Sequence, residues 1–389
     1  MTAMLRVALF TGNYNYIKDG VSLTLNRLVS FLLQHNVKVL VIAPTGPRPA
    51  MAHEGELLAV PSLPVPFRAE YRIALGLTSA VKNRIAEFRP DLFHIAAPDI
   101  AGHRALRLSK DWNIPAVASY HTRFDTYLQH YNLGFLEPLA RRLSRNFYNR
   151  CQHVYPPSQS MADTLRHDGI TSDLRVWSRG IDRNRFNPNK RDTAWRRGLG
   201  IADDEIVIAF AGRLVKEKNT GLLMRVLAAL EKRGNKCRGL IIGDGPEAAS
   251  MKAMNTRTVF AGFLHGDEVP KAYASSDLFM FPSESETFGN VTLEAMASGL
   301  PAICADATGS RSIVGNGVNG FLLPANDEIQ FVACAEKLIR SPELRATLRS
   351  AALKRAQEFD WDTINQCLLA NYHAAVAEYA ANHGPARLP

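Results

Sequence analysis

A turn and a helix predicted within residues 282–301 carry two glutamates beside a helix start. Gly289 is typical of the turn, so the helix should begin just after it. The backbone N–H groups of residues 288–290 would then be unpaired at a helix N-terminus, which favours anion binding. Because Glu286 and Glu294 would repel a phosphate, we interpret them as acceptors for hydroxyl groups further along the same ligand. A sugar nucleotide has this pattern; a pair of ordinary capping and surface glutamates is the alternative.

A second candidate is the basic loop at residues 210–219, which follows a predicted strand at 206–211. Open α/β sheets bind ligands at the carboxyl ends of their strands. Arg213 and Lys218 could both reach a diphosphate there, and neutralising it would then need no divalent metal. A solvated basic turn is the alternative.

A third candidate, His121, follows the predicted strand at residues 115–120. Histidine can act as a general base or hydrogen bond to a sugar, although a single histidine at a strand end is also a common structural residue. Gly20, which opens the first predicted helix, would let a phosphate or sugar approach the backbone closely.

The elements that must position these residues alternate along the chain. Short runs rich in Val, Ile and Phe lack polar alternation, which is typical of parallel strands covered on both faces. Between the first two runs, apolar residues repeat at helical spacing, as a crossover helix requires. The pattern predicts an α/β fold with doubly wound sheets. The predicted strands are 5–10, 37–43, 91–96, 115–120, 153–157, 174–178, 206–211, 238–243, 258–263, 278–282, 301–305 and 320–324.

The length of 389 residues favours two domains. A polar, charged stretch at 183–200 has no apolar period, and we interpret it as a linker. The prediction is one Rossmann-like domain over 1–185 and a second over 201–361, with a ligand-binding cleft between them. The last third is helical, and a C-terminal helix at about 362–389 is expected to cross back to the first domain.

Net charge is +9, and all of this surplus lies in residues 1–185, where Lys and Arg number 23 and Asp and Glu number 14. Such a surplus favours an anionic partner, unless the basic residues are merely solvated. No helix-turn-helix or RNA-binding motif is present, so nucleic acid is not expected. No run reaches a membrane span, no signal peptide is expected before the first predicted strand, and the five scattered cysteines argue against a structural zinc site.

The predicted helix at 135–150 could contact an anionic membrane. Leu139, Leu143 and Phe147 form one apolar stripe along it, which could be buried in lipid or packed on the protein. The segment 67–77 is a second candidate for contact with a lipid or an acceptor. The basic residues off the stripe are Arg141, Arg142, Arg145 and Arg150.

Several motifs together resemble the GT-B retaining glycosyltransferases of the large nucleotide-sugar family, glycosyltransferase family 4. The second half contains GRLVKEKN, IIGDGPE, SSDLFMFPSESETFGNVTLEAMASGLP and NGFLLP in the family's order and spacing. The first half is similar to the lipid hexosyltransferases, such as the sulfoquinovosyl, mannosyl and glucuronosyl diacylglycerol transferases. There the matching parts are Gly20-Val21, the stretch 119–134, Pro157-Ser158 and the stretch 176–182.

The resemblance implies a role for each matching residue. Glu286, with the amides of Phe288, Gly289 and Asn290, would hold the donor hexose, and Glu294 would hold the ribose. A departure from the family lies at Asn290, where a larger aliphatic or aromatic residue is common, so the donor sugar stays open. The remaining assignments are Arg213 and Lys218 on the diphosphate with Gly20 beside it, His121 on the transferred sugar, and Phe263 and Leu264 at the base.

The function implied is transfer of a hexose from a UDP- or GDP-sugar to a membrane lipid such as diacylglycerol, with retained anomeric configuration and no essential metal or cofactor. The enzyme would lie in the cytoplasm, peripherally attached to the inner face of the membrane. Two alternatives stay open: a soluble or polysaccharide acceptor, and a non-catalytic nucleotide-sugar sensor or scaffold.

Overall fold

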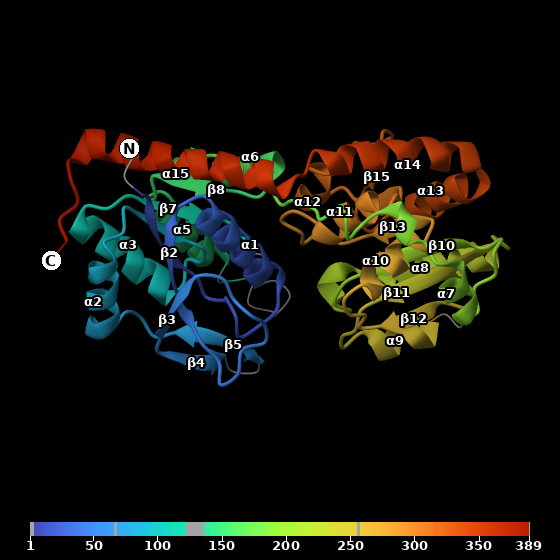
Figure 1. Ribbon diagram of the computed structural model, residues 1–389. Helices are drawn as coiled ribbons and strands as arrows, with labels where there is room; N and C mark the ends of the chain where they lie inside the picture. Colours follow the sequence, from blue (N-terminus) through green and yellow to red (C-terminus); the bar gives the residue numbers. More distant parts are fainter. Residues whose placement is uncertain (1–3, 66–67, 122–134, 136, 255–256, 389) are drawn as a thin grey trace. The chain divides into compact units, whose positions relative to one another are not determined.

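The computed structural model describes residues 4–65, 68–121, 135, 137–254 and 257–388. The chain divides into two compact units (Figure 1). Unit 1 comprises Met1–Ser178 and Asp362–Pro389, and unit 2 comprises Arg179–Trp361.

Unit 1 is built on a parallel sheet that has seven strands in the described residues, in the order β3-β2-β1-β6-β7-β8-β9. An antiparallel hairpin of β4 and β5 forms a separate ribbon. The strands of unit 1 are β1 (Arg6–Phe10), β2 (Lys38–Pro44), β3 (Glu56–Val60), β4 (Ser62–Val65), β5 (Arg68–Ala74), β6 (Leu92–Ile95), β7 (Ala116–Ser119), β8 (His153–Tyr155) and β9 (Asp173–Leu174).

Helices cover both faces of this sheet, because its strands are apolar on both sides. One face packs on α1 (Gly20–Gln34) and on the C-terminal α15 (Trp361–His383), whose Leu368 and Tyr372 are buried there. Figure 1 shows α15, in red, running past β8; His153 on β8 bonds Glu378 on α15 at 3.0 Å. The other face packs on α2 (Ser79–Phe88), α3 (Ile100–Trp112), α5 (Glu137–Tyr148) and α6 (Gln159–His167).

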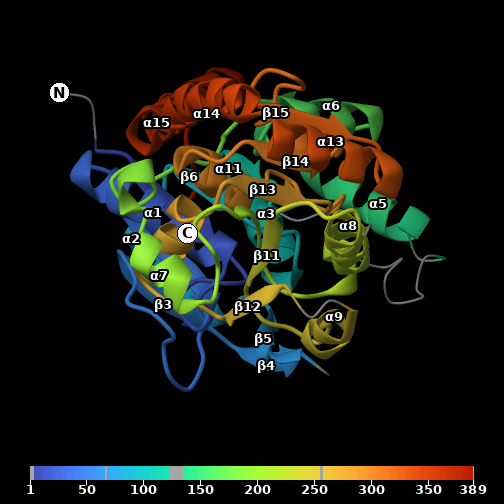
Figure 2. The ribbon, with the colours of Figure 1, turned by 90° about the vertical axis from the view of Figure 1, so that its right-hand side faces the viewer.

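Unit 2 has a parallel sheet in the order β12-β11-β10-β13-β14-β15. Helix α8 packs against α9 and α13 (Figure 2), and α11 packs against α10 and α14. The strands are β10 (Ile206–Ala211), β11 (Cys237–Ile242), β12 (Val259–Gly262), β13 (Leu278–Phe281), β14 (Ala302–Ala305) and β15 (Gly320–Leu323). The helices are η2 (Pro188–Lys190), α7 (Thr193–Gly198), η3 (Lys216–Lys218), α8 (Thr220–Lys232), α9 (Ala248–Met254), α10 (Glu268–Ala274), α11 (Asn290–Ala297), α12 (Thr308–Arg311), α13 (Glu328–Arg340) and α14 (Pro342–Gln357).

Both sheets have a topological switch point, where the strand order reverses. In unit 1 the switch lies between β1 and β6, and in unit 2 it lies between β10 and β13. Ligands of doubly wound sheets bind beyond the carboxyl ends of the strands at this place. The loops that follow these four strands are therefore the expected binding loops of each unit.

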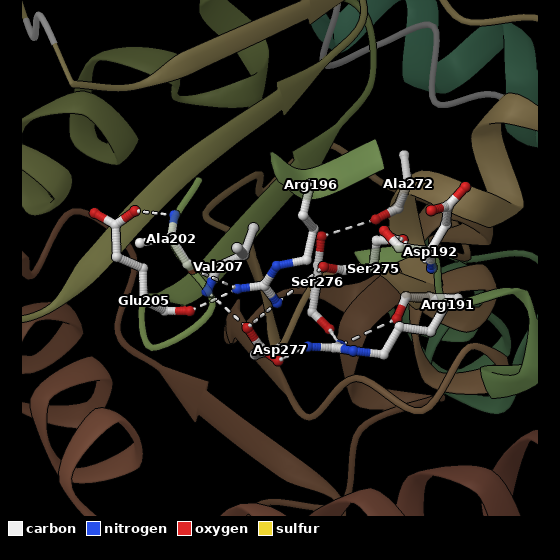
Figure 3. Close-up of polar contacts among 11 residues, drawn as sticks. Arg191, Asp192, Arg196, Ala202, Glu205, Val207, Ala272, Ser275, Ser276 and Asp277 are labelled. Carbon is white, nitrogen blue, oxygen red and sulfur yellow. Dashed lines mark hydrogen bonds and ion pairs between the residues drawn. The ribbon is translucent and has the colours of Figure 1, made fainter. Parts of the chain in front are cut away.

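The stretch 183–200 belongs to unit 2, where a buried arginine fixes it. The guanidinium of Arg196 donates to Asp277 Oδ2 at 3.0 Å and to the main-chain oxygen of Glu205 at 2.7 Å (Figure 3). Arg191 donates to the other oxygen of Asp277 at 3.0 Å. Asp277 also accepts the amide of Val207 at 2.8 Å, so one carboxylate joins η2, α7 and the start of β10.

The predicted α/β architecture of two doubly wound, Rossmann-like domains is confirmed. Most predicted strands form within one or two residues of their expected ends. The strand predicted at 174–178 is wrong in extent, because β9 has only two residues and the chain then leaves the sheet. The sequence reasoning missed β3, β4 and β5: β3 is an edge strand with little burial, and the prolines at 61 and 64 obscured the hairpin.

Candidate active site

At the switch point of unit 2, two residues that were predicted to bind different parts of one ligand contact each other. Lys218, at the end of η3, forms an ion pair with Glu286, on the loop after β13. Both side chains are about four-fifths buried. The Lys218 ammonium also lies 3.5 Å from Ser285 Oγ, and Ser285 Oγ donates to the main-chain oxygen of Glu217 at 3.2 Å. The two binding loops are thus fastened to each other.

Beside this ion pair lies the N-terminus of α11. Gly289 precedes the helix with φ of +95°, a backbone conformation that favours glycine. No hydrogen bond among the described residues uses the amide N–H groups of residues 288–290. These groups are the donors that the sequence analysis proposed for an anion or a hydroxyl-rich ligand. The side chain of Phe288 is buried against Phe359, so only its amide is available.

A close backbone approach shapes the same loop. A Cβ on Gly309 would lie 2.8 Å from the main-chain oxygen of Glu286, so only glycine fits there. Gly309 lies in α12, which follows β14. The sequence reasoning did not single out this residue, although its place just beyond a predicted strand was the available signal.

Glu294 lies one turn inside α11 and is partly buried. Its Oε2 accepts a hydrogen bond from the buried hydroxyl of Tyr273 at 3.2 Å. Burial raises the pKa of Glu294 to about 7, although the Tyr273 hydrogen bond and the charge of Arg185 act in the opposite direction. This carboxylate is therefore poised to change its charge near neutral pH.

The other predicted donor-binding residues of unit 2 lie at neighbouring strand ends. Arg213 follows β10 with an exposed side chain, and Phe263 follows β12 with its ring exposed and edge-on to His265 at 4.8 Å. Leu264 is partly buried against the core. Asn290 is exposed at the first position of α11.

At the switch point of unit 1 there is a cavity of about 430 Å³. The loops after β1 and β6 line it, as the fold predicts, together with the start of α1 and the hairpin β4–β5. His121 is among the lining residues; Gly20 is not, although its neighbours Asp19 and Val21 are. The lining is Thr11, Gly12, Asn13, Asp19, Val21, Val65, Tyr71, Arg72, Ala96, Ala97, Pro98, Asp99, His121 and Tyr148.

The two carboxylates of this cavity already have structural roles. Asp19 caps α1 by accepting the amide of Ser22 at 2.8 Å. Asp99 caps α3 by accepting the amide of Gly102 at 2.8 Å, and burial raises its pKa. The sequence reasoning did not name either residue, although both follow predicted strands and precede helices, a pattern typical of N-caps.

His121 lies two residues beyond β7, with its ring edge-on to Trp177 at 5.9 Å. Its Nε2 hydrogen bonds to Ser119 Oγ at 2.8 Å. The remainder of its motif, residues 122–134, lies outside the described residues.

The predicted basic helix is α5, and the residues of its apolar stripe differ in burial. Phe147 is 1% exposed in the core, whereas Leu139 and Leu143 are 54% and 52% exposed. The alternative that the stripe packs on the protein therefore holds for Phe147 and is wrong for Leu139 and Leu143. Arg141 forms ion pairs with Glu137 and Asp168, while Arg142, Arg145 and Arg150 are exposed.

Family models match both halves of the chain. The model described as Glycosyltransferase Family 4 matches residues 18–185, and the model described as Glycosyl transferases group 1 matches residues 191–355. Within the described residues, no helix is both long enough and apolar enough to cross a membrane.

Curated relatives match almost the whole chain. The GDP-mannose-dependent alpha-mannosyltransferase of Corynebacterium glutamicum is 32% identical, over 96% of this chain and 90% of that protein. Sulfoquinovosyl transferase SQD2 of Arabidopsis thaliana is 31% identical over 92% and 71%, respectively. The alpha-monoglucosyldiacylglycerol synthase of Streptococcus pneumoniae is 24% identical over 92% and 86%.

Among solved structures, sucrose-phosphate synthase from Thermosynechococcus elongatus superposes with a TM-score of 0.78 at 18% identity. The match covers 96% of this chain and 100% of that chain, and it concerns the fold alone. The chain therefore belongs to glycosyltransferase family 4 and is a GT-B glycosyltransferase, as its motifs predicted.

Proposed function

We propose that the protein transfers a hexose from a UDP- or GDP-sugar to a membrane lipid such as diacylglycerol, with retention of configuration, at the cytoplasmic face of the membrane. The part of this proposal that concerns the sugar donor is supported by the cluster of residues at the switch point of unit 2. There the Lys218–Glu286 ion pair lies beside the amides of residues 288–290, which form no hydrogen bond with any residue that the structure describes. This group combines donors for a diphosphate with an acceptor for sugar hydroxyls.

The chemistry is electrostatic. As the bond from the sugar to the diphosphate breaks, negative charge develops on the leaving phosphate oxygen. Arg213, Lys218 and the amides at the start of α11 stabilise that charge. An ammonium group has three donors, so Lys218 can hold Glu286 and a phosphate oxygen together. We propose that these groups suffice without a metal ion.

Glu286 holds the hydroxyl groups of the hexose and so fixes the reacting carbon. His121, in the cavity of unit 1, contacts the transferred sugar, and that cavity receives the acceptor. Phe263 and Leu264 hold the base and Glu294 holds the ribose. GDP-mannose in the name of the Corynebacterium relative supports a nucleotide-sugar donor.

An exposed apolar face on the hairpin supports a lipid acceptor. Leu63 and Ile73 are cross-strand partners of β4 and β5, and both are exposed, as is Leu75. The same hairpin contributes Val65, Tyr71 and Arg72 to the lining of the cavity. Exposed apolar side chains and part of the cavity wall thus lie on one hairpin. The name of the Streptococcus relative includes diacylglycerol, which also supports this acceptor class.

The test of this function begins with thermal unfolding in UDP, GDP, ADP and their sugars. The matching nucleotide, at about 100 times its dissociation constant, should add roughly 2.7 kcal/mol of stability. Transfer from that donor is then compared between diacylglycerol vesicles and soluble sugars, and the anomeric configuration of the product is read by NMR. Transfer to soluble sugars alone would contradict the proposed lipid acceptor and favour a soluble one. Binding without transfer to any acceptor would favour the sensor or scaffold.

Donor affinity should fall as the pH falls through 7. Above pH 7 Glu294 is a carboxylate, which accepts strong hydrogen bonds from the ribose hydroxyls. Below pH 7 it takes up a proton and loses that strength, so the Kd should rise by up to about tenfold per pH unit. Titration calorimetry with the intact nucleotide sugar measures this from pH 8 to 5.5. Glu294→Gln should bind weakly with no such dependence; an unchanged pH profile in this variant would remove Glu294 from the ribose site.

Membrane binding should depend on the arginines of α5. Each basic residue near an anionic surface contributes about 1 kcal/mol, so Arg142→Glu/Arg145→Glu should weaken binding to anionic vesicles at least about tenfold. Binding of the wild type should also weaken as salt rises. Sedimentation with anionic and neutral vesicles measures both effects. The control, Lys232→Glu/Lys354→Glu, makes the same charge change on unit 2; an equal loss in the control would assign binding to net charge instead of α5.

A further inference from the structure

A chain of buried polar side chains connects the C-terminal helix to His121. The Tyr372 hydroxyl, on α15, hydrogen bonds to His94 Nδ1, on β6. His94 Nε2 bonds Ser119 Oγ, on β7, at 2.8 Å, and the same Oγ bonds His121 Nε2 at 2.8 Å. Tyr372, His94 and Ser119 are fully buried, and all four residues belong to unit 1.

The direction of these hydrogen bonds follows from the tyrosine. Burial raises the pKa of Tyr372 well above its usual value, so its hydroxyl keeps its proton. Among the described residues, His94 Nδ1 is the one hydrogen-bond partner of this hydroxyl. A buried O–H group without an acceptor is costly, so Tyr372 donates and His94 Nδ1 accepts.

Each following bond is then determined. A neutral His94 that accepts at Nδ1 carries its proton on Nε2 and donates it to Ser119 Oγ. The single hydroxyl proton of Ser119 is left to donate to His121 Nε2. His121 Nε2 therefore accepts, and the neutral ring carries its proton on Nδ1. The ring of Trp177, edge-on to both histidines at 5.9 Å, holds the two imidazole planes.

We propose that Tyr372, His94 and Ser119 are positioning residues that hold His121 as the tautomer protonated on Nδ1. The proposal rests on the role of His121 in the proposed function, where Nδ1–H gives the imidazole a hydrogen bond to donate to an oxygen of the transferred sugar. If the hydrogen bonds of the chain ran in the opposite direction, Nδ1 of His121 would carry a lone pair and would be a hydrogen-bond acceptor. The C-terminal helix thereby determines the chemical character of a residue 251 positions earlier in the chain.

The test reads the tautomer directly. Protein labelled with ¹⁵N-histidine gives long-range ¹H–¹⁵N spectra that separate protonated from unprotonated ring nitrogens, and His121→Gln assigns the signals. The wild type should show His121 protonated on Nδ1. Tyr372→Phe removes the donor at the head of the chain, and Ser119→Ala breaks it in the middle; both should show protonation of Nε2 as well. Tyr379→Phe, the same change on the same helix, should leave the spectrum as in the wild type.

Kinetics complete the test. Loss of one oriented hydrogen bond should lower the kcat of Tyr372→Phe about tenfold, with the donor KM little changed. A wild-type His121 protonated on Nε2, or an unchanged spectrum in both variants, would overturn the proposal. So would a changed tautomer with unchanged kcat. A wild type with no transferase activity would overturn the proposed function instead, since the spectrum needs no substrate.

Discussion

Replacement of Glu286 by glutamine is expected to lower kcat by about 100-fold or more, while the protein keeps its wild-type melting temperature. The carboxylate accepts hydrogen bonds from the hexose hydroxyls and holds Lys218, so the amide weakens two contacts of the transition state. Both partners lie on loops at the switch point, and neither belongs to the core. The fold should therefore survive, and the loss should appear in kcat more than in nucleotide affinity.

Glu284→Gln is the matched control, since it makes the same change two residues earlier on the same loop, where the side chain is exposed and accepts a hydrogen bond from Asn326. Its kcat should stay near that of the wild type. Lys218→Met should also lose activity, and the double variant should lose much less than the product of the two effects, because each single change already breaks the pair. Wild-type turnover in Glu286→Gln, or fully additive losses, would contradict the role given to this ion pair.

Much of the fold could be predicted because parallel strands in this chain are continuous apolar runs. Strand 206–211 forms as predicted, and with it the loop that carries Arg213 and Lys218. The hairpin could not be predicted in the same way, since β4 and β5 are half-exposed and β5 packs against α3 and β2, which are distant in sequence or form only in the folded sheet. Apolar patterns in a sequence identify strands that are buried, so a half-exposed ribbon such as β4–β5 is poorly predicted by them.

The donor-binding residues of unit 2 could be predicted because they lie in two short, continuous motifs. The cavity of unit 1 was not, because its lining comes from separate segments whose meeting depends on the strand order. The contact between Lys218 and Glu286 joins residues 68 positions apart, and that between His94 and Tyr372 joins residues 278 apart. No periodicity in the sequence reports such pairs.

The largest expected effect on stability comes from Asp277→Ala, which should destabilise unit 2 by about 3–5 kcal/mol. Asp277 is the one carboxylate that the described residues offer to the buried guanidinium of Arg196, and it also accepts Arg191 and the amide of Val207 (Figure 3). Removing it leaves a cation buried without a counter-charge, a costly state. For a unit of this size, the melting temperature should fall by roughly 10 °C.

The neighbouring ion pair provides the control for this prediction. Arg197 pairs with Asp203, with both side chains more than half exposed. Water screens such a pair, so Asp203→Ala should leave the melting temperature close to that of the wild type. Calorimetry of the intact protein, with the transition of unit 2 identified by its shift with the nucleotide, measures both variants. Equal stability of Asp277→Ala and the wild type would mean that Arg196 is held by its main-chain acceptors alone, and that the stretch 183–200 does not need the carboxylate to stay folded on unit 2.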